Sequence, residues 1–173
     1  MNKYVREISL LGVIAALYVA LCIASAPLAF TALQFRIAEV LIVLPFYNKK
    51  YSISIILGTF IANLIGPFGI VDAVVGSAAS ALVCLVIILA KNKIAVAPAA
   101  GIINGLIIGA MIYILDAVVN PLAGLMIAGS VALSVFAVVL LGVLMFAGIE
   151  KTNPRMIKII REMDNSKRNT PVM

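Results

Sequence analysis

Three carboxylates and one guanidinium interrupt stretches of the chain that are otherwise strongly apolar. Arg36 and Glu39 stand near the start of the stretch LQFRIAEVLIVLPF, Asp72 follows the sequence GPFG, and Asp116 ends a later apolar stretch. An ionised side chain in a membrane-like environment is costly, and by default it has a binding or transport role. Carboxylates accept hydrogen bonds from N–H groups or hold a cation, whereas a guanidinium donates to acceptor atoms. The four residues together predict a site for a small polar molecule.

Amide and aromatic side chains occur close to these charges. They are Gln34, Asn63, Asn104 and Asn120, together with Phe35 and Phe68. Four of the expected helices carry polar groups at the same outer level, and one shared cavity explains this better than four unrelated accidents. Carboxylates, an arginine, amides and stacking rings suit a small, flat, hydrogen-bonding ligand, neutral or cationic. They do not suit a lipid or a bare anion.

Each of these residues also has a purely structural interpretation. Arg36 and Glu39 are three positions apart on one helix face, where they could form a salt bridge that relieves part of their burial cost. Asp72 could cap the N-terminus of a helix by accepting from its free N–H groups. Asp116 could lie at the water interface, and Asn104 could make an interhelical hydrogen bond.

The composition indicates which solvent the helices face. The chain has 173 residues, of which 64% are hydrophobic and 12% charged, whereas a soluble domain is about half apolar and about one quarter charged. No soluble fold of this length has enough interior for that much apolar surface, so the composition predicts a membrane protein.

The membrane-spanning helices can be located by length. About 20 apolar residues cross a bilayer as a helix. The expected helices are residues 8–26, 35–47, 51–65, 71–90, 97–115 and 122–149.

The positive charges give this bundle an orientation. With six spans, twelve of the 13 basic residues fall on one face, and Arg36 is the exception. The positive-inside rule makes that face cytoplasmic. The sequence therefore predicts an all-α membrane protein, a six-transmembrane-helix bundle with cytoplasmic N- and C-termini. The run at 8–24 ends in ASA, as a signal peptide would, but Pro27 disfavours cleavage there, so we expect a retained first helix.

The chain divides into a transmembrane domain at 1–150 and a basic cytoplasmic tail at 151–173. Within the tail, the stretch NPRMIKIIREM predicts a short amphipathic helix, with Asn153 as its cap and Pro154 at its first position. This helix could rest on anionic lipid or dock on a cytoplasmic partner.

The residue types that are missing limit the function. The sequence has no histidine, and its two cysteines lie in apolar runs, so we expect no metal site and no cofactor. It has no GxxxxGK motif for ATP and no GxSxG motif for hydrolysis. We therefore expect a protein that is not an enzyme and that cannot use ATP by itself.

Two of the expected helices carry small residues at every fourth position, a spacing that lets backbones approach closely in lipid. The positions are Ala16, Ala20 and Ala24 in the first helix, and Gly101, Gly105 and Gly109 in the fifth. Packing within the monomer is the default interpretation of both. The alanine face could instead meet another membrane subunit.

Three stretches resemble a known family. They are LQFRIAEVLIVLPF, GTFIANLIGPFGIVDAVVGSAASAL at 58–82 and IINGLIIGAMIY at 102–113. The combination of Q-F-R-x-x-E, A-N-L-x-G and D-x-x-x-G resembles the queuosine-precursor transporter family, whose members are substrate-binding S components of energy-coupling-factor (ECF) transporters. The resemblance implies a six-helix bundle, in the cytoplasmic membrane of a prokaryote, with a loop-lidded cavity near the outer face.

The resemblance also implies partners and a ligand. The partners are a transmembrane coupling protein, which would meet Ala16, Ala20 and Ala24, and two ATP-binding-cassette ATPases. The ligand is a 7-deazaguanine, such as 7-aminomethyl-7-deazaguanine, or queuine. Glu39 and Asp72 would accept hydrogen bonds from its N–H groups and pair with its cationic aminomethyl group. The further ligand contacts would be Gln34, Phe35, Arg36, Asn63, Phe68 and Asn104.

Two points stay open at the level of sequence. The resemblance leads us to expect further acidic residues in the last two helices, where this chain has GAMIYIL and ALSVFAVVLLG, so the ring substituent of the ligand is not fixed. The alternative function is a self-sufficient, homo-oligomeric transporter or channel for a small polar or cationic solute, assembled through the glycine face.

Overall fold

The computed structural model describes residues 3–29, 35–90, 92–115 and 120–162. Four helices are long and apolar enough to cross a membrane. They are α1 (Lys3–Ala24), α5 (Ile70–Ala90), α6 (Val96–Leu115) and α7 (Pro121–Thr152). The shorter elements are α2 (Ala26–Ala29), η1 (Ile37–Val43), α3 (Leu44–Tyr47), α4 (Tyr51–Asn63), η2 (Lys93–Ala95) and α8 (Pro154–Glu162). The described chain is therefore all-helical, as the sequence predicts.

The second predicted helix differs from the structure. We expected one α-helix at 35–47, but Ile37–Val43 is a 3-10 helix and only Leu44–Tyr47 is α-helical. Pro45 gives a physical reason, because it has no N–H group to donate to the carbonyl of Leu41. The N–H of Leu44 donates to the carbonyl of Leu41 instead, which is the i to i+3 hydrogen bond of a 3-10 helix. A 3-10 run of this length is uncommon.

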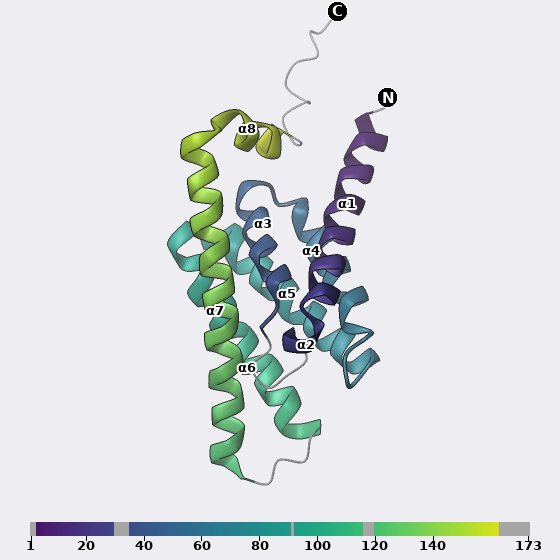
Figure 1. The fold of residues 1–173 in the computed structure, drawn as a ribbon, viewed down its shortest axis with the longest axis vertical. Coiled ribbons are helices and arrows are strands. Elements are labelled where there is room, and N and C mark those ends of the chain that lie inside the picture. Colours follow the sequence, from purple (N-terminus) through teal and green to yellow (C-terminus); the bar gives the residue numbers. More distant parts are fainter. Residues whose placement is uncertain (1–2, 30–34, 91, 116–119, 163–173) are drawn as a thin grey trace, which may run out of the picture.

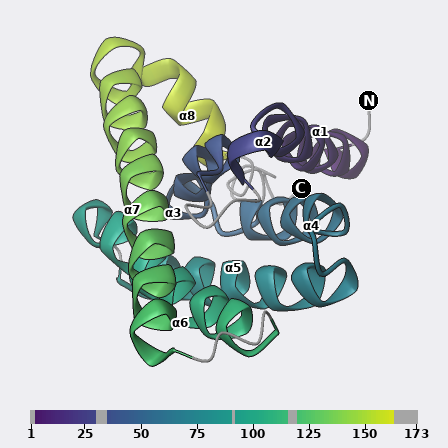
Figure 2. The same ribbon diagram turned by 60° about the horizontal axis from the view of Figure 1, so that its bottom comes forward.

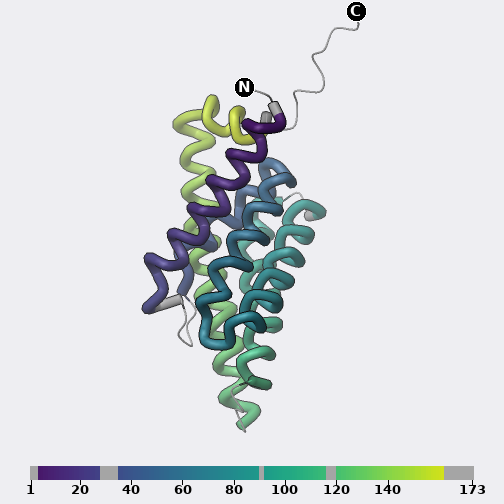
Figure 3. The backbone as a smooth tube through the Cα atoms, turned by 90° about the vertical axis from the view of Figure 1, so that its right-hand side faces the viewer, coloured from purple at the N-terminus to yellow at the C-terminus, as the bar shows by residue number. Residues whose placement is uncertain are grey.

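Six apolar segments pack into a closed ring. The 3-10 segment η1 contacts α1, which contacts α4, and the ring continues through α5, α6 and α7 back to η1. Figure 1 shows these segments running roughly along the long axis of the molecule. Figure 2, turned to bring the lower end forward, separates α1 and α4 on one side from α6 and α7 on the other. The side-by-side packing of α1 and α4 is clearest in Figure 3.

The interior and the outer surface of the ring are both apolar. Tyr18, Ile42, Ile55 and Val83 are fully buried at its centre. Large apolar side chains such as Leu133 point outward and are exposed. An exposed apolar surface of this kind is what a bundle shows when lipid is its solvent.

The glycine face of α6 packs inside the monomer, against α7. A Cβ atom added at Gly105 would lie 2.6 Å from the Cβ of Ala132, and one added at Gly109 would lie 2.6 Å from the Cα of Ala128. Real Cβ atoms do not approach that closely, so the two backbones need these glycines to pack as they do. The glycine face is thus occupied within the chain.

The substitution Gly109→Ala is expected to lower the free energy of unfolding by about 1–3 kcal/mol, because the added methyl group meets the α7 backbone. Thermal unfolding in detergent would measure the loss. Gly148→Ala is the matched control, since nothing lies within 4 Å of its added Cβ. Equal unfolding temperatures for the two variants would contradict this description of the α6–α7 contact.

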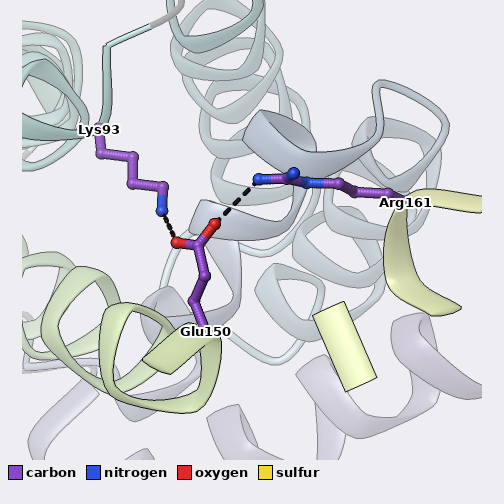
Figure 4. A network of polar contacts seen from close by, with 3 residues as sticks. All are labelled: Lys93, Glu150 and Arg161. Carbon is purple, nitrogen blue, oxygen red and sulfur yellow. Dashed lines mark hydrogen bonds and ion pairs between the residues drawn. The ribbon is translucent and has the colours of Figure 1, made fainter. Parts of the chain in front are cut away.

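The end of the bundle that carries α8 is held together by charges. Glu150 near the end of α7 forms ion pairs with Lys93 and with Arg161, the latter at 3.0 Å (Figure 4). Lys50 and Glu7 form a further ion pair at 2.6 Å, between the starts of α4 and α1. The beginning of α1 and α8 therefore lie at the same end of the molecule, which Figure 1 also shows.

The tail helix α8 docks on the bundle of its own chain. The N–H of Met156 donates to Oδ1 of Asn153 at 3.3 Å, as expected for a capping asparagine. Ile157 is buried, and the hydroxyl of Tyr51 donates to the carbonyl of Ile160 at 3.3 Å. The apolar side of α8 is thus partly used within the chain, while Met156 and Ile159 remain exposed.

Candidate ligand-binding site

Four of the polar groups singled out in the sequence, those of Arg36, Glu39, Asn63 and Asp72, lie toward the end of the bundle opposite α8. The start of η1, the last turn of α4 and the first turn of α5 come together there. The guanidinium of Arg36 donates to Oδ1 of Asn63 at 2.7 Å, and the amide of Asn63 donates to the carbonyl of Asp72 at 3.1 Å. All three side chains are buried. One chain of hydrogen bonds therefore links the three segments.

Asp72 holds the turn before α5, whereas the sequence position suggested a cap on the free N–H groups of the helix itself. Its Oδ2 atom accepts from the backbone N–H of Phe68 at 3.0 Å and holds the turn that precedes α5. Gly69 lies in this turn with φ of 55°, a backbone conformation that favours glycine. The ring of Phe68 is partly buried against the core. The carboxylate thus anchors the backbone beside the Arg36–Asn63 pair.

Glu39 uses only one of its carboxylate oxygens within the described chain. The hydroxyl of Tyr18 donates to Oε1 at 2.9 Å. The other oxygen, Oε2, is buried and has no hydrogen-bond partner among the residues that the structure describes. The Glu39 side chain is only 3% exposed. A buried carboxylate oxygen without such a partner is costly, so it is the strongest candidate for a ligand contact in the part of the chain that the structure describes.

Arg36 and Glu39 do not have each other as hydrogen-bond partners, in contrast to the simple salt bridge considered from the sequence. Arg36 bonds to Asn63 on α4, and Glu39 bonds to Tyr18 on α1. The positive charge of Arg36 still acts on the Glu39 carboxylate. Arg36 precedes η1 in an extended conformation, whereas Glu39 lies within the 3-10 helix. The two groups reach different neighbouring helices.

Two glycines make room for this network. A Cβ atom at Gly76 would lie 2.0 Å from Nδ2 of Asn63, and one at Gly66 would lie 2.3 Å from Oδ2 of Asp72. Gly66 belongs to the stretch that contains Asn63, whereas Gly76 belongs to the stretch that contains Asp72. Each of the two sequence motifs therefore supplies the glycine that accommodates the polar side chain of the other.

Other residues singled out in the sequence take no part in the hydrogen bonds described above or fall outside the described chain. Asn104 donates to the carbonyl of Ala100 in its own helix at 2.9 Å, and not to another helix as its structural interpretation suggested. Asn120 caps α7 by accepting from the N–H of Leu122 at 2.9 Å. Phe35 is half-buried just before η1. Gln34 and Asp116 lie outside the described residues.

Tyr18 is the member of this network that sequence reasoning missed. It is fully buried in the second half of α1. The sequence favoured packing of Ala16, Ala20 and Ala24 within the monomer, but these three alanines are exposed. Tyr18 and Cys22, on the opposite side of α1, are buried instead.

The network has the chemistry of a hydrogen-bonding ligand site. Its groups are a carboxylate oxygen with no hydrogen-bond partner among the described residues, a guanidinium and an amide that bond to each other, and a turn held by the Asp72 carboxylate. Within the described residues, no group of three or more His, Cys, Asp or Glu side chains could hold a metal ion.

The sequence profile of the family described as QueT transporter matches residues 8–151. The chain belongs to the QueT transporter family. With four helices long and apolar enough to cross a membrane, it is a multi-pass membrane protein. The Queuosine precursor transporter QueT of Lactococcus lactis subsp. cremoris (strain MG1363) is 36% identical over 72 residues. That match covers 40% of this chain and 42% of the relative. No solved structure matches the chain.

Membership of the QueT family gives the network its context. The profile match at 8–151 includes every residue of the network, from Tyr18 to Gly76. The network therefore lies within the part of the chain that matches the family.

Proposed function

We propose that this chain is the substrate-specificity (S) component of an ECF-type importer and that it binds a queuosine precursor. The observation that carries the proposal is the buried Oε2 of Glu39, which has no hydrogen-bond partner among the described residues and lies beside the Arg36–Asn63–Asp72 network in a QueT-family chain. A ligand that donates an N–H group to this oxygen would offset its burial cost.

The chemistry of a 7-deazaguanine fits these groups. Its guanine-like edge offers N–H donors for Glu39, and its ring carbonyl is an acceptor for Arg36 or for an amide. The aminomethyl group of 7-aminomethyl-7-deazaguanine is cationic, and Asp72 is the second carboxylate at this end of the described chain. Gln34, Phe35, Phe68 and Asn104 remain proposed contacts from the sequence.

The orientation of the bundle in the membrane follows from its charges. Arg155, Lys158 and Arg161 on α8, together with Lys50 and Lys93, belong to the end opposite the site. Under the positive-inside rule that end is cytoplasmic, and we propose a bundle of six spans in the inner membrane of a prokaryote. The ligand would then enter from outside.

The proposed partners are a transmembrane coupling protein and two ATP-binding-cassette ATPases. Ala16, Ala20 and Ala24 are exposed on one side of α1, where small side chains allow a second helix to approach closely. We propose this face as the contact with the coupling protein. The homo-oligomeric alternative relied on the glycine face of α6, which packs against α7 within the chain. Co-purification with the ATPases would favour the S component over that alternative.

The proposal predicts selective binding of a deazaguanine. The purified protein is expected to bind 7-aminomethyl-7-deazaguanine or queuine more tightly than guanine or unrelated vitamins. Isothermal calorimetry or the ligand-induced shift of the unfolding temperature would measure the affinities. Failure to bind any deazaguanine would contradict the proposed substrate class.

A further inference from the structure

Tyr18 holds the Glu39 carboxylate from a different helix. Its hydroxyl donates to Oε1 at 2.9 Å, and the tyrosine side chain is fully buried. A hydrogen bond from a neutral donor to a carboxylate is stronger than one between two neutral groups. This bond joins α1 to η1 at the level of the proposed ligand contact.

The position of the tyrosine ring is itself constrained by α4. A Cβ atom added at Gly58 would lie 2.9 Å from Cβ of Tyr18 and 3.1 Å from its Cδ1 atom. The α4 backbone therefore passes directly against the base of the ring. A tyrosine has few rotatable bonds, so a ring that is fixed at its base also fixes the direction of its hydroxyl.

The two oxygens of Glu39 consequently differ. Oε1 is occupied by a donor of the protein, while Oε2 is buried without a partner among the described residues. If the carboxylate rotated, the hydrogen bond from Tyr18 would break or would pass to the other oxygen. The bond therefore holds the carboxylate in an orientation that leaves one oxygen available to accept from a ligand.

We propose that Tyr18 is a positioning residue that fixes the orientation of Glu39 and reserves Oε2 for an N–H donor of the solute. This inference rests on the proposed function, because it assigns a role in the same site. It adds that α1, the helix with the exposed alanine face, contributes to recognition of the solute. Tyr18 itself need not touch the solute.

The test compares two buried tyrosines that each lose only a hydroxyl group. Tyr18→Phe is expected to lower the affinity for 7-aminomethyl-7-deazaguanine about tenfold, the size of effect that follows from losing one hydrogen bond. Tyr51→Phe is the matched control, because Tyr51 is also buried but donates to the carbonyl of Ile160 in α8. It is expected to leave the affinity unchanged. Unfolding temperatures of both variants would show that the fold is kept.

A second variant leaves the hydroxyl in place. Gly58→Ala pushes on the Tyr18 ring and is expected to lower the affinity as well, although it removes no polar atom. In a Glu39→Gln background, Tyr18→Phe is expected to cost less affinity than in the natural sequence, since the two residues act as a unit.

The outcomes separate the two proposals. Wild-type binding together with an unchanged affinity of Tyr18→Phe would overturn the role of Tyr18 and leave the proposed function standing. Equal losses in Tyr18→Phe and Tyr51→Phe would overturn it too, because they would reflect general destabilisation. If the wild-type protein bound no deazaguanine, both proposals would fall.

Discussion

Replacing Glu39 with glutamine is expected to lower the affinity for 7-aminomethyl-7-deazaguanine roughly 100-fold. A hydrogen bond to a charged group contributes about 1.5–3 kcal/mol, and 1.4 kcal/mol corresponds to a factor of ten. Glutamine keeps the shape of the side chain but removes its charge and replaces one oxygen by an N–H donor. Calorimetric titration of the purified variant would give the change in affinity.

Glu150→Gln provides the matched control for this substitution. Glu150 is at the opposite end of the bundle, where it pairs with Lys93 and Arg161. The control is expected to loosen α8 and to leave the affinity unchanged. We also expect Asp72→Asn to abolish binding, because it removes the negative charge proposed to hold the aminomethyl cation while its amide oxygen can still accept from the N–H of Phe68. Unchanged affinity in both Glu39→Gln and Asp72→Asn would refute the proposed site.

The substitution Gly76→Ala is expected to disrupt the same site from α5, on the side where Asn63 packs against that helix. Its methyl group would lie 2.0 Å from Nδ2 of Asn63, so the asparagine has to move away from Arg36. Overpacking of this kind costs about 1–3 kcal/mol of unfolding free energy. The loss of the Asn63 contact is expected to lower the affinity for the ligand about tenfold or more. Thermal unfolding and ligand titration of one sample would measure both effects.

Gly129→Ala separates this effect from the general consequence of adding a methyl group to a helix. Nothing lies within 4 Å of a Cβ at Gly129 in α7. Alanine is the better helix former by about 1 kcal/mol, so this variant is expected to be as stable as the natural protein or more stable. If Gly76→Ala behaved like Gly129→Ala, the close approach of Asn63 to α5 would be refuted.

Most of the helical framework was predictable from the sequence because lipid imposes long apolar runs. The predicted helix at 71–90 corresponds to α5 at Ile70–Ala90, and that at 97–115 to α6 at Val96–Leu115. The segment at 35–47 was not predictable in the same way. Its apolar pattern fits both kinds of helix, and the 3-10 geometry depends on hydrogen bonds around Pro45 that hydropathy does not report.

The candidate site was predictable in part. Polar residues that are out of place in apolar runs identified Arg36, Glu39, Asn63 and Asp72, which the structure brings to one end of the bundle. Asn104 has the same sequence signature, but its amide bonds within its own helix. Tyr18 went unnoticed because tyrosine is common in membrane helices and only the rotation of α1 about its axis directs it toward Glu39.

The crossed placement of the two glycines has a consequence for the evolution of the family. Gly76 accommodates Asn63, and Gly66 accommodates Asp72. A larger residue at either glycine would be tolerated only where its polar counterpart had already become smaller. Each glycine should therefore co-vary among relatives with the polar residue on the other segment, rather than with its own neighbours in the chain.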